Sequence, residues 1–149
     1  MNSLRIFVLA AAFTMIMAPA AAAKSKTDPA KAMADRINAV RADHGLRPLK
    51  VAPKLMGSSR RYVKRMMRHD SFSHGSAFRV PGFRTSGEML AYDRGWRLKP
   101  GPAIRMWLGS PGHRALMLSN SFRYVGASPA RGRFGGGLTT MWVVHLAAH

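Results

Sequence analysis

One glutamate and two histidines are the clearest candidates for chemistry in this sequence. Glu88 is the only glutamate among the 149 residues, and it lies in the segment Ser-Gly-Glu-Met-Leu, which is too apolar for a solvated loop. We therefore expect its carboxylate to be at least partly buried. A buried carboxylate must be paired with a cation, a hydrogen-bond donor or a metal. An arginine in a structural ion pair and a functional partner are both consistent with this pattern.

Two of the six histidines, His74 and His113, lie in irregular segments marked by glycine or proline. His113 falls near the third position of a helix expected to start at Ser110-Pro111. The positive end of the helix dipole there disfavours a charged imidazolium. A neutral imidazole is the form that binds metal or accepts a proton. A histidine that only helps to cap the turn would give the same pattern, so both interpretations remain open.

The remaining histidines and the short motifs add little. His44 and His69 are expected at helix C-termini, where a cation is favourable, and His145 and His149 lie in or after the last strand without supporting context. The sequence contains no His-Glu-x-x-His pair, no Gly-x-Ser-x-Gly elbow and no phosphate-binding glycine loop. The chain has no cysteine, which excludes disulfides and thiolate zinc sites. Any metal would have to bind histidine and carboxylate.

The N-terminus has the order of a secretory signal. One cation in Met1–Arg5 precedes an uncharged apolar run over Ile6–Met17, and small residues end at Ala23. The run is short for a bilayer span, which needs about 20 apolar residues, although a retained anchor is the alternative. We expect cleavage after Ala23 and a secreted or periplasmic protein. The predicted organisation is a signal peptide over 1–23, a lead-in and helix start over 24–33, and one domain over 34–149.

The charge is strongly positive and predicts anionic partners. There are 24 Lys and Arg residues against 6 Asp and Glu, a formal net charge of +18. Such a balance favours anionic lipid, acidic polysaccharide or nucleic acid, and export favours an anionic envelope or extracellular polymer over nucleic acid. A merely solvated basic surface is the alternative. The expected basic surface is one face of the second helix, formed by Arg60, Arg61, Lys64, Arg65 and Arg68.

Segments with helical spacing come first along the chain, and segments with strand composition come last. The stretch 70–100 has no clear periodicity, but it is too apolar for disorder. Helices followed by strands, without regular alternation, indicate an α+β domain. The expected helices are Pro29–His44, Pro53–Arg68, Pro102–Leu108 and one beginning at Ser110; the expected strands are Phe122–Ala127 and Leu138–Leu146, joined by the glycine-rich segment Gly132–Gly137.

Several segments, taken in order, resemble the CAP superfamily (cysteine-rich secretory proteins, antigen 5 and pathogenesis-related proteins) in its bacterial form. The most specific is Ser110-Pro111-Gly112-His113-Arg114 after Trp107. The others are Ile37–Arg41 with the exit Gly45–Leu49, Phe72-Ser73-His74, Gly87-Glu88, Tyr124-Val125-Gly126 and Met141–Val144. The match covers about Ala34 to Leu146.

The resemblance implies a three-layer α–β–α sandwich with a central, mainly antiparallel sheet. It also implies a cleft that can bind a divalent metal, and some family members bind sterols or other lipids. On this basis His74, Glu88 and His113 are the expected cleft residues, supported by Ser110, Arg114 and Trp107.

The sequence departs from the family pattern at several positions. Met89 replaces the asparagine of the Gly-Glu-Asn motif, and Ser110 replaces a second glutamate of eukaryotic members. Their later histidine has no counterpart in Thr139–Trp142, and their cysteines are missing. A zinc ion would have a suitable set of ligands in His74, His113, Glu88 and a water molecule. A hydrogen-bond network without metal fits the same residues equally well.

Three functions fit these observations. The first is a non-enzymatic binder that takes a small or lipidic ligand in the cleft and lies on an anionic polymer through its basic surface. The second is a metal-dependent hydrolase with Glu88 as base, although no nucleophile is recognisable. The third is an electrostatic binder of nucleic acid or polysaccharide, for which few aromatic residues are available to stack on bases. We favour the binder, without an assigned enzymatic activity.

Overall fold

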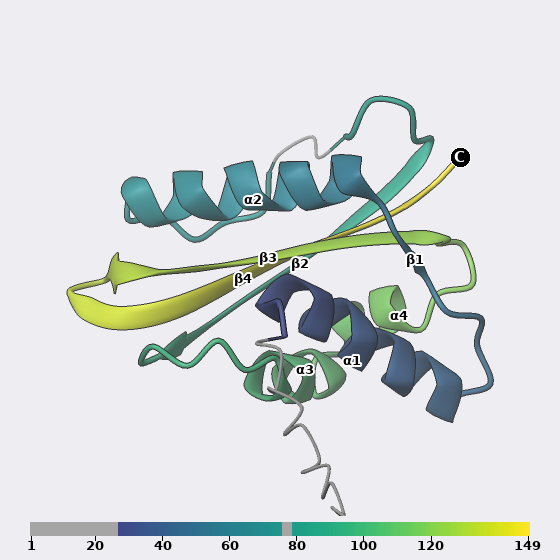
Figure 1. Ribbon diagram of the computed structural model, residues 1–149, viewed down its shortest axis with the longest axis horizontal. Coiled ribbons are helices and arrows are strands. Elements are labelled where there is room, and N and C mark those ends of the chain that lie inside the picture. The colour runs from purple at the N-terminus through teal and green to yellow at the C-terminus, as the bar shows by residue number, and fades with distance from the viewer. Residues whose placement is uncertain (1–26, 76–78) are drawn as a thin grey trace, which may run out of the picture.

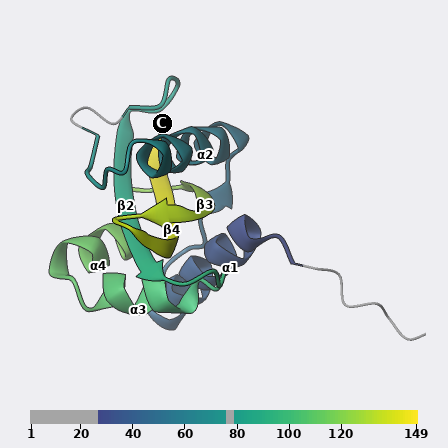
Figure 2. The same ribbon diagram turned by 90° about the vertical axis from the view of Figure 1, so that its left-hand side faces the viewer.

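Helices cover both faces of a four-stranded sheet in the computed structural model, which describes residues 27–75 and 79–149 (Figure 1). The expected signal peptide lies outside these residues. The strand order is β1-β3-β4-β2, with β4 antiparallel to both neighbours and β1 parallel to β3. Helix α2 lies on one face, and α1, α3 and α4 lie on the other (Figure 2). The expected α+β sandwich with a mainly antiparallel sheet is confirmed. The bounds are α1 Pro29–Asp43, β1 Lys50–Val51, α2 Pro53–Arg68, β2 Thr85–Arg94, α3 Gly101–Leu108, α4 Pro111–Met117, β3 Tyr124–Phe134 and β4 Gly137–Ala148.

The helices begin where the sequence places their caps. The Asp28 carboxylate accepts a hydrogen bond from the Ala30 amide at 3.0 Å, and a proline occupies the first turn of each helix. One expectation differs. Ser110 occupies the N-cap position of α4, but its hydroxyl makes no capping bond and instead contacts the ring of His113. Ser110 therefore orients a histidine, and α4 begins without a side-chain cap.

Two strands were missed by the sequence analysis. Strand β2 lies within the stretch 70–100 that shows no clear periodicity. Its residues Met89 and Ala91 enter one core, while Leu90 enters the core on the opposite face, so both faces are apolar and alternation is hidden. Strand β1 has only two residues. The hairpin β3–β4 also runs further than expected into the glycine-rich segment, and its turn is made by Gly135 and Gly136 at φ 54° and 74°.

Each face of the sheet carries its own core. The larger core joins α1, α3 and the edge of α4 to the sheet around the fully buried Trp107 and Trp142. The indole Nε1 of Trp107 donates a hydrogen bond to the Leu90 carbonyl at 2.8 Å, which fixes α3 against β2. The smaller core, around Val63, Met66 and Val143, lies beneath α2. Packing on both faces of the sheet therefore fixes β2 at Leu90, two residues from Glu88.

Helix α2 approaches the sheet most closely at Gly126 of β3. The Ser59 hydroxyl donates to the Gly126 carbonyl at 2.8 Å. A Cβ atom on Gly126 would lie 2.2 Å from the carbonyl carbon of Leu55, a distance that real atoms do not reach. Backbone therefore rests on backbone here, and the glycine sets the height of α2 above the sheet.

Within the described ranges, no helix is both long and apolar enough to cross a bilayer.

The substitution Gly126→Ala should destabilise the fold strongly. The added methyl group meets backbone atoms that cannot rotate away, so we expect a loss of about 3 kcal/mol, at the upper end of overpacking penalties. Urea unfolding followed by far-UV circular dichroism measures it. Gly112→Ala is the matched control, because no atom of the described residues lies within 4 Å of a Cβ there. Equal unfolding free energies for the two variants would contradict this account of α2 packing.

Candidate functional site

The Glu88 carboxylate lies at the centre of a hydrogen-bonded cluster on the α2 face of the sheet. Its Oε1 accepts from Nδ1 of His74 at 2.9 Å and from the Gly75 amide at 3.2 Å. Its Oε2 accepts from Nε2 of His145 at 3.0 Å. The loop that carries His74 is in turn held to α2, because the Tyr62 hydroxyl donates to the Ser73 carbonyl at 2.7 Å. Strand, helix and loop together position the carboxylate.

The donors around Glu88 determine its ionisation. Burial alone would raise the pKa of this carboxyl, which is 8% exposed, but the hydrogen bonds from His145, His74 and the Gly75 amide lower it overall. Glu88 is thus ionised and can only accept hydrogen bonds. It follows that Nδ1 of His74 and Nε2 of His145 carry protons. In a neutral His74 ring, Nε2 then offers a lone pair.

His145 is the member of the cluster that the sequence analysis set aside. It pairs directly with Glu88 across the β2–β4 ladder and is fully buried. Burial lowers the pKa of His145 and the charge of Arg61 lowers it further, against the raising effect of Glu88. The alternation of Met141, Val143 and His145 on one face of β4 could have signalled its direction. Its partner becomes visible only once β2 is recognised.

His113 lies beside this cluster. Its ring centroid is 6.1 Å from that of His74, and its Nδ1 lies 2.9 Å from the Ser110 hydroxyl oxygen. Burial, and then the nearby charge of His74, lower the pKa of His113. Both effects disfavour the charged imidazolium, and burial is the larger of the two. The structure thus brings His74, Glu88 and His113 to one region, with His113 next to His74 and not on the carboxylate.

Of the two arrangements that the sequence left open, a hydrogen-bond network is observed, and a zinc ion on His74, His113 and Glu88 does not fit it. Both oxygens of Glu88 are occupied by hydrogen bonds to histidine, and Nδ1 of His74 is directed at the carboxylate rather than at a shared centre. Among the residues that the structure describes, no three His, Cys, Asp or Glu side chains are grouped so that they could hold a metal. The described residues indicate no cofactor.

The three residues expected to support the cleft lie in different places. Ser110 contacts His113 directly. Trp107 lies in the core of the opposite face, where its indole donates to the carbonyl of Leu90, two residues from Glu88. Arg114 is exposed and lines a separate hollow beside Leu118.

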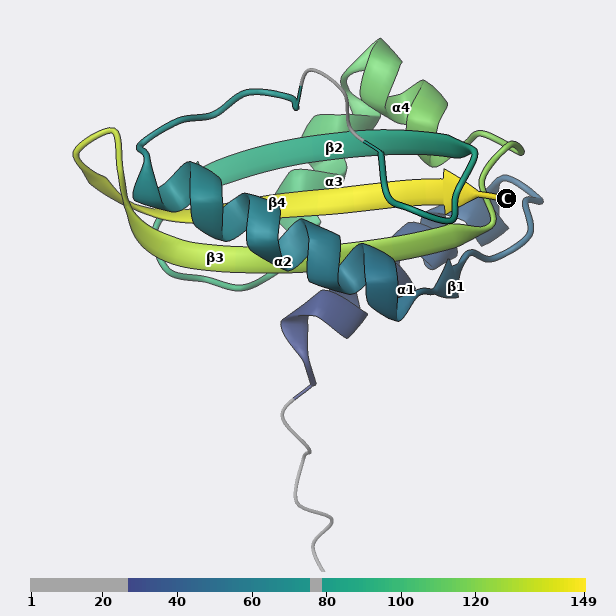
Figure 3. The same ribbon diagram turned by 90° about the horizontal axis from the view of Figure 1, so that it is seen from above.

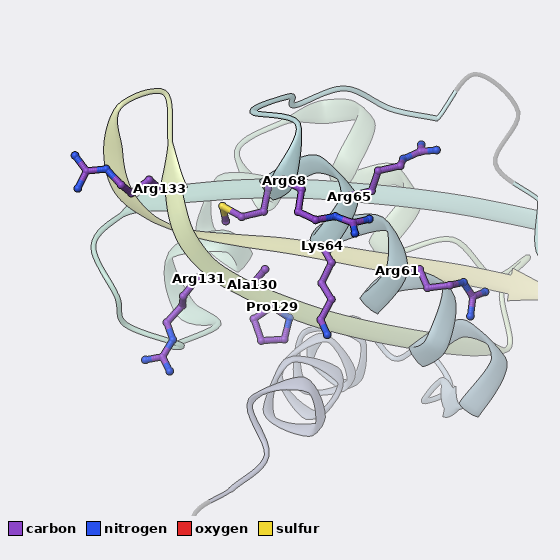
Figure 4. Close-up of a pocket in the computed structure, with 9 residues that line it drawn as sticks. Arg61, Lys64, Arg65, Arg68, Pro129, Ala130, Arg131 and Arg133 are labelled. Atoms are coloured by element: carbon purple, nitrogen blue, oxygen red, sulfur yellow. The ribbon is translucent and has the colours of Figure 1, made fainter.

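A larger hollow lies between the outer face of α2 and the edge of β3, and we call it the basic groove (Figure 4). Its volume is about 730 Å³. Its floor contains Met67, Pro129 and Ala130, and the other described residues that line it are cationic: Arg61, Lys64, Arg65, Arg68, Arg131 and Arg133. Four of these belong to the predicted basic surface, while Arg60 of that surface lies outside the groove. The two β3 arginines were missed, because the sequence does not show that β3 runs beside α2.

The cations of the basic groove have no acidic partners in the part of the chain that the structure describes. In residues 27–75 and 79–149, an ion pair joins Lys31 to Asp35, and the Glu88 carboxylate accepts hydrogen bonds from two histidines. Arg65 stacks over the Tyr62 ring at 4.7 Å, and Arg131 lies over Trp96 at 5.5 Å. Like charges gathered around one groove repel each other, and an anion bound between them would relieve that repulsion.

The basic groove continues toward the glutamate cluster. A second hollow of about 320 Å³ shares Arg61 and Arg65 with it and is also lined by Ser58, Tyr62 and His145. One face of α2 therefore carries both features, with its cations at the surface and the buried Glu88–His145 pair beneath.

The fold is that of an α–β–α sandwich, and sequence comparison identifies the family. The profile of "CAP: Cysteine-rich secretory protein family" matches residues 34–146, and the chain belongs to this family. It is 29% identical over 132 residues to "Uncharacterized protein YkwD" of Bacillus subtilis, a match that covers 76% of this chain. The chain spans 50% of the length of that relative.

Solved structures show the same fold. An outer surface protein of Borrelia burgdorferi is similar with a TM-score of 0.65 and 19% identity, over 84% of this chain and 98% of that one. An extracellular protein containing a SCP domain from Bacillus anthracis is similar with a TM-score of 0.64 and 21% identity, over 81% of this chain and 40% of that one. The recognised family and fold are thus confirmed.

The buried His145 should make stability depend on pH in mild acid. Because its folded-state pKa lies below the ordinary 6.5, the unfolded chain binds more protons as the pH falls past that value. Stability is therefore complete above about pH 6.5 and is lost as the pH falls toward the folded pKa. His145→Gln should reduce the slope by up to about 1.4 kcal/mol per pH unit.

Urea unfolding between about pH 7.5 and 5, above the range where exposed carboxylates titrate, measures this slope. His69→Gln, at the exposed end of α2, is the control for removing an imidazole outside the glutamate cluster. His113 adds a slope of the same sign, which both variants retain. An unchanged slope in His145→Gln would show that the Glu88–His145 pair is not linked to folding.

Proposed function

We propose that this CAP-domain chain is an exported, non-enzymatic binding protein that holds phosphate-bearing anionic ligands of the cell envelope in its basic groove. The observation that carries the proposal is the groove itself, with six cations, an apolar floor and no acidic side chain among the described residues that line it. Guanidinium groups match the geometry of phosphate oxygens. Polymers and lipid headgroups share this phosphate chemistry.

Action outside the cytoplasm is supported by two observations. The N-terminal order of a cation, an apolar run and small residues is that of a secretory signal. Proteins of similar fold are described as an outer surface protein and an extracellular protein. An envelope rich in phosphate groups would complement the net charge of +18.

The hydrolase alternative has less support. A general base must reach the proton it removes, whereas both Glu88 oxygens already accept hydrogen bonds from histidine. A zinc ion on His74, His113 and Glu88 would require these bonds to break. We assign the glutamate cluster a positioning role: it fixes the floor beneath α2 and the loop that carries His74.

Substituting groove arginines should weaken binding to linear inorganic polyphosphate. Arg65→Gln and Arg131→Gln, each removing one phosphate contact, should reduce affinity about 10-fold and lower the slope of log affinity against log salt by about one. Fluorescence anisotropy with labelled polyphosphate at several salt concentrations measures both quantities.

Arg60→Gln is the matched control, because Arg60 is exposed on the same helix but does not line the groove. It removes one charge and should change affinity about 2-fold or less. Equal losses for Arg60→Gln and Arg65→Gln would mean a diffuse basic surface without a site. Tighter binding to single-stranded nucleic acid than to polyphosphate of equal charge would favour the nucleic-acid alternative.

A further inference from the structure

Exposed apolar side chains gather at one end of the molecule. Six large apolar residues of the described ranges are exposed, and four of them lie at the end where the β3–β4 hairpin turns. They are Phe72 at 38%, Tyr92 at 36%, Trp96 at 48% and Leu138 at 48% exposure. We call these four residues the hairpin end. This end of the sheet lies opposite the C-terminus (Figure 3).

The exposed apolar residues at this end form two groups. The rings of Phe72 and Tyr92 are 4.9 Å apart, and Phe134 of the hairpin lies 5.1 Å from Tyr92. The Gly95 amide donates to the Leu138 carbonyl at 2.8 Å, which holds the Trp96 loop beside the start of β4. The first three rings lie on the α2 face of the sheet, whereas Leu138, like Trp142 further along β4, lies on the opposite face, near the Trp96 loop.

Polar contacts hold the hairpin end in place. Arg94 donates to the Phe134 carbonyl at 2.6 Å and to the Thr139 hydroxyl at 3.1 Å. The Asp70 carboxylate, at the end of α2, accepts from the Gly135 amide at 2.6 Å. The turn is thus tied to both β2 and α2. The exposed apolar groups are therefore carried by a turn that hydrogen bonds hold in place.

Cations lie beside Trp96 and Leu138 and connect these two residues to the basic groove. Arg131 and Arg133 line the groove and also flank the hairpin, and Arg68 lies at the adjoining end of α2. Arg131 lies over the Trp96 ring and donates to its carbonyl at 3.4 Å. Of the described acids, Asp70 and Asp93 lie at this end, and the arginines outnumber them.

We propose that the hairpin end docks on the surface of an anionic lipid bilayer, with Trp96 and Leu138 entering the interface and groove arginines contacting lipid phosphates. The proposal rests on the proposed function, because the groove must accept phosphate. Tryptophan and tyrosine favour the membrane interface, and basic residues beside apolar ones strengthen binding to anionic lipid. A soluble polymer would make no use of the apolar groups, and a second copy would bring the same net charge of +18 against this surface.

Tryptophan fluorescence tests the docking directly. Trp107 and Trp142 are fully buried, so a change on lipid binding reports on Trp96. The protein is recovered after export by its expression host and mixed with vesicles of equimolar phosphatidylglycerol and phosphatidylcholine. We expect a blue shift of emission and quenching by acyl-brominated lipid. Vesicles of phosphatidylcholine alone should give neither.

Leu138→Gln should abolish the shift and weaken vesicle binding by about 10-fold. It adds no charge beside Arg133, its cross-strand neighbour, so binding to soluble polyphosphate should change about 2-fold or less. Met106→Gln is the matched control, because Met106 is also 48% exposed and lies on α3, not on the hairpin. It makes the same apolar-to-polar change and should bind vesicles like the unsubstituted protein. Since all variants share one N-terminus, the comparison isolates the hairpin end.

The outcomes separate the two proposals. Vesicle binding without a Trp96 shift or quenching, or equal losses in Leu138→Gln and Met106→Gln, would overturn docking while leaving phosphate binding by the groove intact. Vesicle binding that depends on Leu138, in a protein that does not bind polyphosphate, would instead overturn the proposed function.

Discussion

The contact between α2 and β3 at Gly126 is the constraint on which the remaining features depend. Because backbone meets backbone there, α2 lies low across the sheet with one stripe in the core and the opposite face in solvent. The same placement brings Tyr62 over His145 and sets Arg65 and Arg68 beside the edge of β3. The basic groove exists because this helix and this strand are neighbours.

In the described part of the chain, the negative charge of Glu88 is paired within the fold, whereas the positive charges of the groove arginines are not. The single glutamate is placed among three donors that keep it ionised in a largely buried position. The arginines of α2 and β3 are left without carboxylate partners in the described residues. A fold held by carboxylate bridges would pair such cations internally. Leaving them unpaired costs self-repulsion, and that cost makes sense for a surface that meets an anion.

Helices were readable from this sequence because each carries local signals. Asp28-Pro29, the stripe from Leu55 to Met66 and the Ser110-Pro111 start were sufficient to place them to within one or two residues. Strand β2 was not readable, because burial on both faces removes the alternation that marks a strand. Only part of the glutamate cluster could be predicted, for the same reason. His145 reaches Glu88 because β4 pairs with β2, and local sequence patterns do not show which strands pair. Arg131 and Arg133 likewise became groove residues only through the position of their strand.

The central claim is that anions bind between α2 and β3, and chemical-shift mapping with inorganic tripolyphosphate tests it most directly. Amide and arginine side-chain signals should move for residues 61–68 and 129–133, saturably and less at high salt. Small shifts spread over basic residues elsewhere, such as Arg36 and Arg47, would contradict the claim. So would shifts centred on His74 and His113 while the groove signals stay in place.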